Sequence, residues 1–432
     1  MTIAVVAAAG LAAAVVFLGA PGLFRSAHDG VSQGPLPATS GSGAPTTAAA
    51  PPSSAPLSAT PTESVPAPAP APTSAPTVPV PTKPPAQQVL AALTPEQRIG
   101  QVLMVSSPVG GADANTLAAL DLDHVGNVFL KGRSYAGSAA AASVVAALRT
   151  HASAAATGGV KQFIATDQEG GLVQILNGPG FSAMPSALQQ GTLAPGVLRG
   201  QAAEWGRELA AAGINVNFAP VMDTVPSAAF APSNIPIGHY NREFGFTPAV
   251  VSSHGTAFAQ GMADAGVLPV VKHFPGLGRV TANTDTSTAV TDSITVRNDP
   301  YVQPFRDAVQ AVPGWVMASN AYYPAIDPDH IAPFSPVVLR DMIRGDLNFT
   351  GIVVSDDLCD AVQLSPFNEA NRAADFIAAG GTMALCTNQA KLPVLYQGML
   401  DRYRADPAFA KQVDAAALLV LTKKAGAGLL GP

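Results

Sequence analysis

Charged side chains are scarce in this sequence, and several of them follow short apolar runs. Charged residues make up only 12% of the 432 residues. Polar groups stand where such runs end, at Asp167 with Glu169, Asp223, Lys272 with His273, Asn320, and Asp356 with Asp357. Carboxylates can act as nucleophiles or exchange protons, and Lys and His can donate hydrogen bonds to a polar substrate. The pattern indicates one site built from distant parts of the chain, although any single Asp could instead cap the following helix.

Eight apolar runs of strand length alternate with longer helical segments. The runs are 101–107, 125–131, 161–169, 214–223, 267–275, 315–324, 351–358 and 382–387, and helices are expected between them, for example over 200–212 and 370–379. Buried parallel strands have this continuous apolar character. Eight such units predict a (β/α)8 barrel, in which the C-terminal ends of the strands meet at one mouth. A doubly wound sheet is the rival fold, but no glycine-rich phosphate loop follows the first run.

The first 88 residues differ in composition from the rest of the chain. Residues 2–23 carry no charge and are long enough to cross a bilayer as a helix, so 1–29 are predicted to be an export signal or a membrane anchor. Residues 30–88 are rich in Pro, Ala, Ser and Thr and are predicted to form a disordered linker. We therefore expect an extracytoplasmic protein, either membrane-anchored or secreted.

The folded domain is predicted to span 89–432. Thr94 and Gln97 have the spacing of a capping box, which is typical of a helix N-terminus. The sequence contains only two cysteines, Cys359 and Cys386, which excludes a disulfide scaffold and a cysteine-rich zinc site. They follow the seventh and eighth runs, which would be neighbours in a barrel. Either a disulfide or two buried thiols would fit that position.

Charge and histidine spacing exclude several classes of partner. Lys and Arg number 23 against 29 Asp and Glu, a net charge of −6, so we expect no basic surface for nucleic acid. The seven histidines show no spacing typical of a metal site, and no metal or organic cofactor is predicted. A monomer is expected.

Several motifs together resemble those of glycoside hydrolase family 3. They are Asp167–Gly171 (DQEGG), Lys272–Gly276 (KHFPG), Tyr301–Arg306 (YVQPFR), Leu347–Gly351 (LNFTG) and Val354–Leu358 (VSDDL). The resemblance covers residues 89–432 and is greatest to the single-barrel β-N-acetylglucosaminidases of that family. It implies a retaining enzyme that removes terminal β-N-acetylglucosamine from peptidoglycan fragments through a covalent glycosyl-enzyme intermediate. The expected substrate is thus an N-acetylglucosamine-containing glycan or muropeptide.

The same resemblance assigns roles to individual residues. Asp356 matches the family's catalytic nucleophile, and Asp357 is expected to orient loops or cap a helix. The residues assigned to substrate binding are Asp167, Arg242, Lys272, His273 and Asp223. For Asp223, holding a neighbouring loop is an equally good alternative.

The proton donor is where this sequence departs from the family pattern. The related enzymes usually carry an Asp-Ser-His element after KHFPG, whereas this chain has Asp285 at the Asp and Ser287 at the His. Either Asp285 supplies the proton directly, or catalysis is weak. Another alternative is a barrel that binds glycans without hydrolysing them. Leu172 and Ile175 also stand where Arg is common. A family 3 hydrolase of other exo-specificity, such as a β-glucosidase, is a further alternative.

Overall fold

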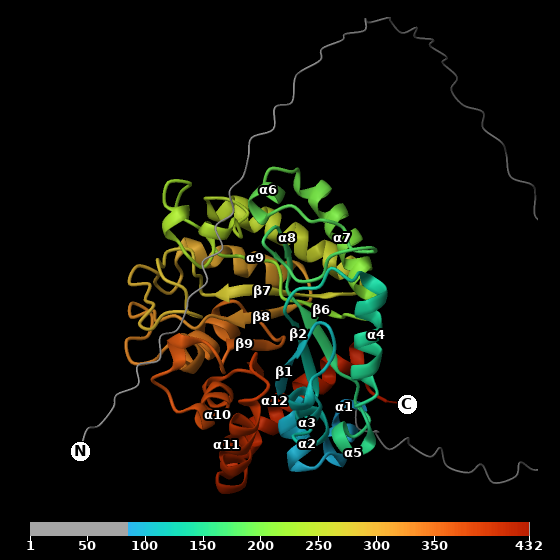
Figure 1. The fold of residues 1–432 in the computed structure, drawn as a ribbon. Coiled ribbons are helices and arrows are strands. Elements are labelled where there is room, and N and C mark those ends of the chain that lie inside the picture. Colours follow the sequence, from blue (N-terminus) through green and yellow to red (C-terminus); the bar gives the residue numbers. More distant parts are fainter. Residues whose placement is uncertain (1–84, 432) are drawn as a thin grey trace, which may run out of the picture. The chain divides into compact units, whose positions relative to one another are not determined.

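The computed structural model describes residues 85–431, which form a closed barrel of eight parallel strands surrounded by helices (Figure 1). In chain order the strands are β1 (Leu103–Pro108), β2 (Asn127–Lys131), β3 (Phe163–Thr166), β6 (Val216–Asn217), β7 (Leu268–Phe274), β8 (Trp315–Ala318), β9 (Val353–Asp357) and β10 (Met383–Cys386). Each strand pairs with its neighbour in this order, and β10 pairs with β1 to close the barrel. The predicted (β/α)8 fold is confirmed, and each of the eight apolar runs corresponds to one of these strands, with β1 ending one residue beyond its run.

The helices follow the strands and form the outer layer of the barrel (Figure 1). They are α1 (Pro85–Ala92), α2 (Pro95–Gln101), α3 (Ala114–Asp121), α4 (Ser138–Arg149), α5 (Ala154–Thr157), α6 (Ala187–Gln190), α7 (Pro195–Ala211), α8 (Pro248–Asp264), α9 (Gln303–Ala311), α10 (Glu369–Ala379), α11 (Leu392–Ala405) and α12 (Pro407–Gly426). A π-helical segment covers Val337–Asp346. The helices expected over 200–212 and 370–379 correspond to α7 and α10. A short hairpin of β4 (Gln168–Gly170) and β5 (Val173–Gln174) follows β3.

The described part of the chain begins with α1, and the boundary predicted near residue 89 falls inside this helix. α1 contributes buried apolar side chains that pack with Leu421 of α12. The capping box expected before α2 is present, since Thr94 Oγ1 accepts a hydrogen bond from the Gln97 backbone N–H at 3.2 Å. The predicted membrane segment and most of the predicted linker lie outside the described residues. Between residues 85 and 431, no helix combines the length and apolar character needed to cross a membrane.

The upper part of the barrel interior is filled by one layer of side chains. Phe129 of β2, Phe218 just after β6, Met317 of β8 and Leu385 of β10 come from alternate strands. Four inward-facing residues from alternate strands are the usual layer of such a barrel. The rings of Phe129 and Phe218 stack with centroids 5.2 Å apart. All four side chains line the same cavity, so this apolar layer forms part of its wall.

The opposite, amino-terminal end of the barrel is closed by α12. The fully buried Lys424 of this helix donates to Gln101 Oε1 at 2.8 Å and to the Gly126 carbonyl at 2.9 Å. These two residues precede β1 and β2. Burial lowers the pKa of Lys424 well below its usual value. The cavity bordered by the apolar layer lies at the opposite end, where the strands have their carboxyl termini.

Candidate active site

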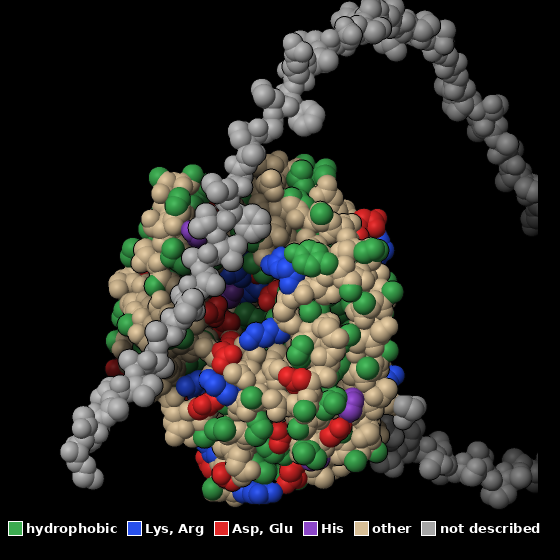
Figure 2. Space-filling view, viewed as in Figure 1, with side chains coloured by type: hydrophobic (Ala, Val, Ile, Leu, Met, Phe, Trp, Pro, Cys, Tyr) green, Lys and Arg blue, Asp and Glu red, His purple; other side chains and the backbone are tan. Residues whose placement is uncertain are grey.

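A cavity of about 400 Å³ opens at the carboxyl-terminal ends of the barrel strands. Every predicted site residue except Asp223 lines it, namely Asp167, Arg242, Lys272, His273, Asp285 and Asp356. Figure 2 shows the hollow, with Asp and Glu side chains inside it and Lys and Arg side chains along its rim. The fold thus brings together side chains that lie far apart in the sequence.

One wall of the cavity is an ion network centred on the buried Glu169. Arg242 binds both carboxylate oxygens of Glu169, with Nε and Nη2 at 2.8 and 2.7 Å. Lys272 Nζ lies 2.6 Å from Glu169 Oε1 and 2.6 Å from Asp167 Oδ1. Arg242 also donates to the Pro236 carbonyl at 2.8 Å. The network fixes two cations and one carboxylate, Asp167, at the cavity surface.

The pKa values in this network favour the charged forms. Burial opposes ionisation of Glu169, but the positive charges of Arg242 and Lys272 outweigh it and lower the pKa of Glu169 to about 2. Burial likewise opposes the charge of Lys272, and the carboxylates of Asp167 and Glu169 raise its pKa. The wall therefore stays ionised at neutral pH and offers charge-assisted hydrogen bonds to hydroxyl groups.

Asp223 is fully buried and holds the segment that carries His273. Its Oδ2 lies 2.7 Å from His273 Nδ1, and its Oδ1 accepts from the Leu277 backbone N–H at 2.8 Å. A carboxylate at Nδ1 favours the tautomer with its proton there, which leaves Nε2 for a ligand. The position of Asp223 behind the wall fits the loop-holding alternative rather than substrate contact.

Asp356 lies at the end of β9 and lines the cavity beside His273. Its Oδ1 accepts a hydrogen bond from the Asp357 backbone N–H at 2.8 Å. Burial raises the pKa of Asp356, and the nearby His273 acts in the opposite direction. A carboxylate that is partly removed from water retains more of its nucleophilic character than a fully solvated one.

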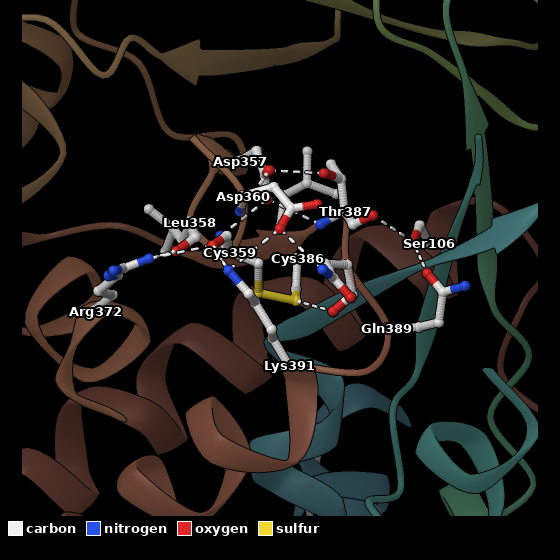
Figure 3. Close-up of a disulfide and its surroundings, with 12 residues drawn as sticks. Ser106, Asp357, Leu358, Cys359, Asp360, Arg372, Cys386, Thr387, Gln389 and Lys391 are labelled. Atoms are coloured by element: carbon white, nitrogen blue, oxygen red, sulfur yellow. Dashed lines mark hydrogen bonds and ion pairs between the residues drawn. A yellow bond between two sulfur atoms is a disulfide. The ribbon is translucent and has the colours of Figure 1, made fainter. Parts of the chain in front are cut away.

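Asp357 links the loops that follow β9 and β10 (Figure 3). Its Oδ1 accepts from the backbone N–H groups of Cys359 and Thr387, each at 2.9 Å. Its Oδ2 accepts from the Asp360 N–H at 2.9 Å and from Thr387 Oγ1 at 2.6 Å. The Cys359–Cys386 pair is a disulfide that joins the loop after β9 to the last residue of β10, with Cα atoms 5.1 Å apart. Asp357 therefore has the loop-orienting position expected for it, and the cysteines are oxidised.

The loop that carries Asp285 is held by the loop after β9. The Gln363 backbone N–H donates to the Thr284 carbonyl at 3.0 Å, and the Gln363 side chain binds both the N–H and the carbonyl of Val290. Asp285 keeps an exposed face, but partial burial and the negative charges of Asp356 and Asp357 raise its pKa to about 6. Ser287 is not among the residues that line the cavity. Of the two residues discussed for the missing Asp-Ser-His element, Asp285 lines the cavity and Ser287 does not.

Comparison with known proteins identifies the family of this barrel. The sequence profile of the glycosyl hydrolase family 3 N-terminal domain matches residues 94–422. The chain belongs to glycosyl hydrolase family 3. It is therefore a glycoside hydrolase, and the resemblance drawn from the sequence motifs is confirmed.

The family 3 relatives of this chain include bacterial β-hexosaminidases. The β-hexosaminidase LpqI of Mycobacterium tuberculosis is 30% identical over 349 residues, which cover 77% of this chain and 84% of the relative. A β-hexosaminidase of Nitrosomonas eutropha is 31% identical over 290 residues, or 65% and 79% of the two chains. The crystal structure of a β-N-acetylhexosaminidase from Beutenbergia cavernae shares 48% identity with a TM-score of 0.76, over 77% of this chain and 99% of that one.

Several residues around this family 3 site were not predicted from the sequence. Lys131, Asp360 and Thr387 line the cavity and were not singled out, whereas Glu169 was singled out but assigned no role, and it binds Arg242 and Lys272. Lys131 is the last residue of β2, and Thr387 follows β10 directly. The search for polar residues at strand ends that singled out Asp356 could therefore also have identified them. Leu172 and Ile175 stand at positions where Arg is common in the related enzymes. Ile175 lines the cavity and Leu172 is exposed.

Metal binding has no support in the described range. Within residues 85–431, no group of three or more His, Cys, Asp or Glu side chains is arranged to hold a metal ion.

Glu243, the residue after Arg242, has a buried carboxyl group with no partner for its charge. Neither of its carboxylate oxygens reaches a hydrogen-bond partner on another residue of the described chain. Burial raises its pKa from 4.5 to about 7. Because the pKa of Glu243 is higher in the folded than in the unfolded protein, its contribution to the free energy of unfolding depends on pH. This contribution is complete below pH about 4.5 and is lost as the pH rises through about 7.

We therefore expect Glu243→Gln to stabilise the protein at pH 8 but not at pH 4.5. The gain in the free energy of unfolding should be about 1 to 3 kcal/mol at pH 8, because an uncompensated buried charge is removed. Urea unfolding at both pH values measures it. The matched variant Glu204→Gln, on the exposed face of α7, should change stability by less than about 0.5 kcal/mol. Equal gains for Glu243→Gln at both pH values would contradict the raised pKa.

Proposed function

We propose that this family 3 glycoside hydrolase is a retaining β-N-acetylglucosaminidase that acts on peptidoglycan fragments. The observation that carries the proposal is the placement of Asp356 and Asp285 on one cavity. Beside them stand the paired cations Arg242 and Lys272, which suit a polyhydroxylated sugar. The relatives described above are named β-hexosaminidases, which supports an N-acetylated hexose as the sugar that is released.

The proposed reaction has two steps. A bond between Asp356 and the anomeric carbon forms in the first step and breaks in the second. In the first, the ionised Asp356 attacks the anomeric carbon while the glycosidic C–O bond breaks, and Asp285 gives its proton to the leaving oxygen. In the second, the ionised Asp285 takes a proton from water, and the water oxygen displaces Asp356 from the anomeric carbon. Asp167, Lys272, Arg242 and His273 bind the hydroxyl and acetamido groups of the terminal sugar.

The sugar specificity is tested by comparing aryl N-acetylglucosaminide with aryl glucoside. Preference for the N-acetylglucosaminide supports the proposal, and preference for the glucoside would point to the β-glucosidase alternative. Binding of both without turnover would point to a glycan-binding protein.

Asp356→Ala should abolish turnover, with a loss on the order of 10⁴-fold or more, because no covalent intermediate can form. The thermal unfolding midpoint should change little, since Asp356 lies at the cavity rather than in the packed core. Initial rates on an aryl N-acetylglucosaminide and a thermal melt measure the two effects. The control variant Asp401→Ala, on the exposed surface of α11, should keep full activity. Substantial activity in Asp356→Ala would remove this residue from the nucleophile role.

Asp285→Ala should slow hydrolysis of disaccharides by about 10²- to 10⁴-fold and should affect an activated aryl glycoside far less. An aryl leaving group needs little protonation, so the difference isolates the acid role. In the unaltered protein, kcat/KM for disaccharides should fall above pH about 6, because Asp285 must be protonated and its pKa is about 6. This decline should vanish in Asp285→Ala. Equal losses on both substrates would leave Asp285 without a role in proton transfer.

We also propose that the protein works outside the cytoplasm. The buried Cys359–Cys386 disulfide supports this, because cytosolic reductants keep most thiols reduced. The apolar run at 2–23, outside the described residues, supports it from the sequence. Cell fractionation, followed by maleimide labelling of the denatured protein without reductant, should find an unlabelled protein in the extracytoplasmic fraction. Labelled cysteines in the cytoplasmic fraction would contradict export.

A further inference from the structure

The loop that carries Asp285 is long and contains no helix or strand. It runs from residue 275, after β7, to residue 299, before the helical turn Pro300–Val302 and α9. Loops of this length without secondary structure are uncommon in compact domains, and many of them are functional. Gln363 holds the loop at Thr284 and Val290. The two ends of the loop therefore depend on other contacts.

An ion pair with two contacts joins the two ends of this loop. Arg279 Nη1 lies 2.8 Å from Asp299 Oδ2, and Nη2 lies 3.1 Å from Oδ1. The Arg279 guanidinium also stacks on Tyr301, with its Cζ 3.8 Å from the ring centroid. Arg279 and Asp299 have only 14% and 7% of their side chains exposed. Ion pairs in such a partly buried place are screened by salt much less than surface pairs.

The ion pair continues into the loop through Thr295 and Asp292. Arg279 Nη1 donates to Thr295 Oγ1 at 2.7 Å, and this hydroxyl donates to Asp292 Oδ2 at 2.6 Å. Asp292 Oδ1 also accepts from the Thr295 backbone N–H at 2.9 Å. The Asp292 N–H donates to the Tyr322 carbonyl at 2.9 Å, in the segment after β8. We refer to Arg279, Asp292, Thr295 and Asp299 as the loop clamp.

The loop clamp acts on the cavity only through the backbone of the loop. None of its four residues is among those that line the cavity, whereas Asp285, six residues after Arg279, is. The chain on the β7 side of the clamp is fixed by Asn234, whose Nδ2 donates to the carbonyls of Leu277 and Val280 at 2.8 and 2.7 Å. Arg279 thus extends from a fixed segment and holds the part of the loop that returns to α9.

The acidity of Asp285 depends on where the loop places its carboxyl group. Partial burial raises its pKa most, and the negative charges of Asp356 and Asp357 raise it further, whereas His273 and Arg242 lower it. The balance brings the pKa to about 6. Each of these effects weakens with distance or with exposure to water. Movement of the loop away from the cavity would therefore return the pKa of Asp285 towards 3.8, its ordinary value.

We propose that the loop clamp positions the proton donor of this family 3 site, with Arg279 as its central residue. The inference rests on the proposed function, in which Asp285 gives its proton to the leaving oxygen. Arg279 is a positioning residue rather than a catalytic one, because it does not line the cavity. Without its guanidinium, the carboxylates of Asp292 and Asp299 lose the cation that both of them face. The loop can then open at its base, and Asp285 moves with it.

Arg279→Gln should lower the pH at which kcat/KM for N,N′-diacetylchitobiose begins to fall. If the pKa of Asp285 moves from about 6 to about 5, its protonated fraction at pH 6 falls roughly five-fold, and kcat/KM falls with it. At pH 4.5 the loss should be much smaller, because most Asp285 stays protonated. An activated aryl N-acetylglucosaminide should lose little at either pH, since its leaving group needs little protonation. Equal losses on both substrates at both pH values would overturn the positioning role.

Three further variants separate the clamp from general effects on the fold. Arg199→Gln breaks a similar two-contact pair with Asp264, on the outside of α7 and α8, and should leave the pH profile unchanged. Arg279→Lys keeps the charge and should restore part of kcat/KM at pH 6. Thr295→Val removes only the hydroxyl between Arg279 and Asp292. It should give a smaller shift in the same direction, and it tests the clamp even if Arg279→Gln fails to fold in a thermal melt.

Amide hydrogen exchange of the whole protein reports on the loop without any turnover. Peptides that cover 281–298 should exchange faster in Arg279→Gln than in the unaltered protein, while peptides from β9 keep their rates. Unchanged exchange in this loop, or an unchanged pH profile, would overturn the loop clamp. Failure of the unaltered protein to hydrolyse any N-acetylglucosaminide would overturn the proposed function, and the exchange rates alone would then decide whether the clamp holds the loop.

Discussion

The pairing of one buried carboxylate with two cations organises one wall of the cavity in this barrel. Glu169 is almost completely removed from water, and a buried charge is tolerated only when partners compensate it. Arg242 and Lys272 supply that compensation from two other parts of the chain. Their positions are therefore set by Glu169, and both present donors to the cavity. Loss of any member would leave an unpaired buried charge, so the network forms as a unit.

The side of the cavity that carries Asp356, the proposed nucleophile, is held by a different kind of interaction. Asp357 accepts four hydrogen bonds from the loops after β9 and β10, and the Cys359–Cys386 disulfide links the first of these loops covalently to the end of β10. Asp356 is thereby positioned by its neighbour rather than by strong contacts of its own. This arrangement leaves its carboxylate directed at the cavity and available for chemistry.

The loop after β9 also connects the two carboxylates of the proposed reaction. Gln363 lies in this loop and binds the backbone on both sides of Asp285, at Thr284 and Val290. One continuous segment thus carries Asp356 at its start and, through Gln363, contacts the loop of Asp285. The raised pKa of Asp285 depends on this arrangement, since the charges of Asp356 and Asp357 act only at short range. In the proposed reaction, Asp285 supplies the titratable group that Ser287 does not.

The sequence by itself determined the barrel, because buried parallel strands are continuously apolar and a local capping box such as that of Thr94 needs no distant partner. It also singled out Asp356 and Lys272 near strand ends, and the structure places both side chains on the cavity. Tertiary structure decided which polar residues face the cavity and which stay behind its wall. Asp223 and Asp356 look alike in sequence, each an Asp after an apolar run, but only the packing of the KHFPG segment makes Asp223 a structural partner of His273. The disulfide and the role of Glu169 were decided in the same way, since pairing between side chains of separate strands depends on three-dimensional proximity, which local sequence does not encode.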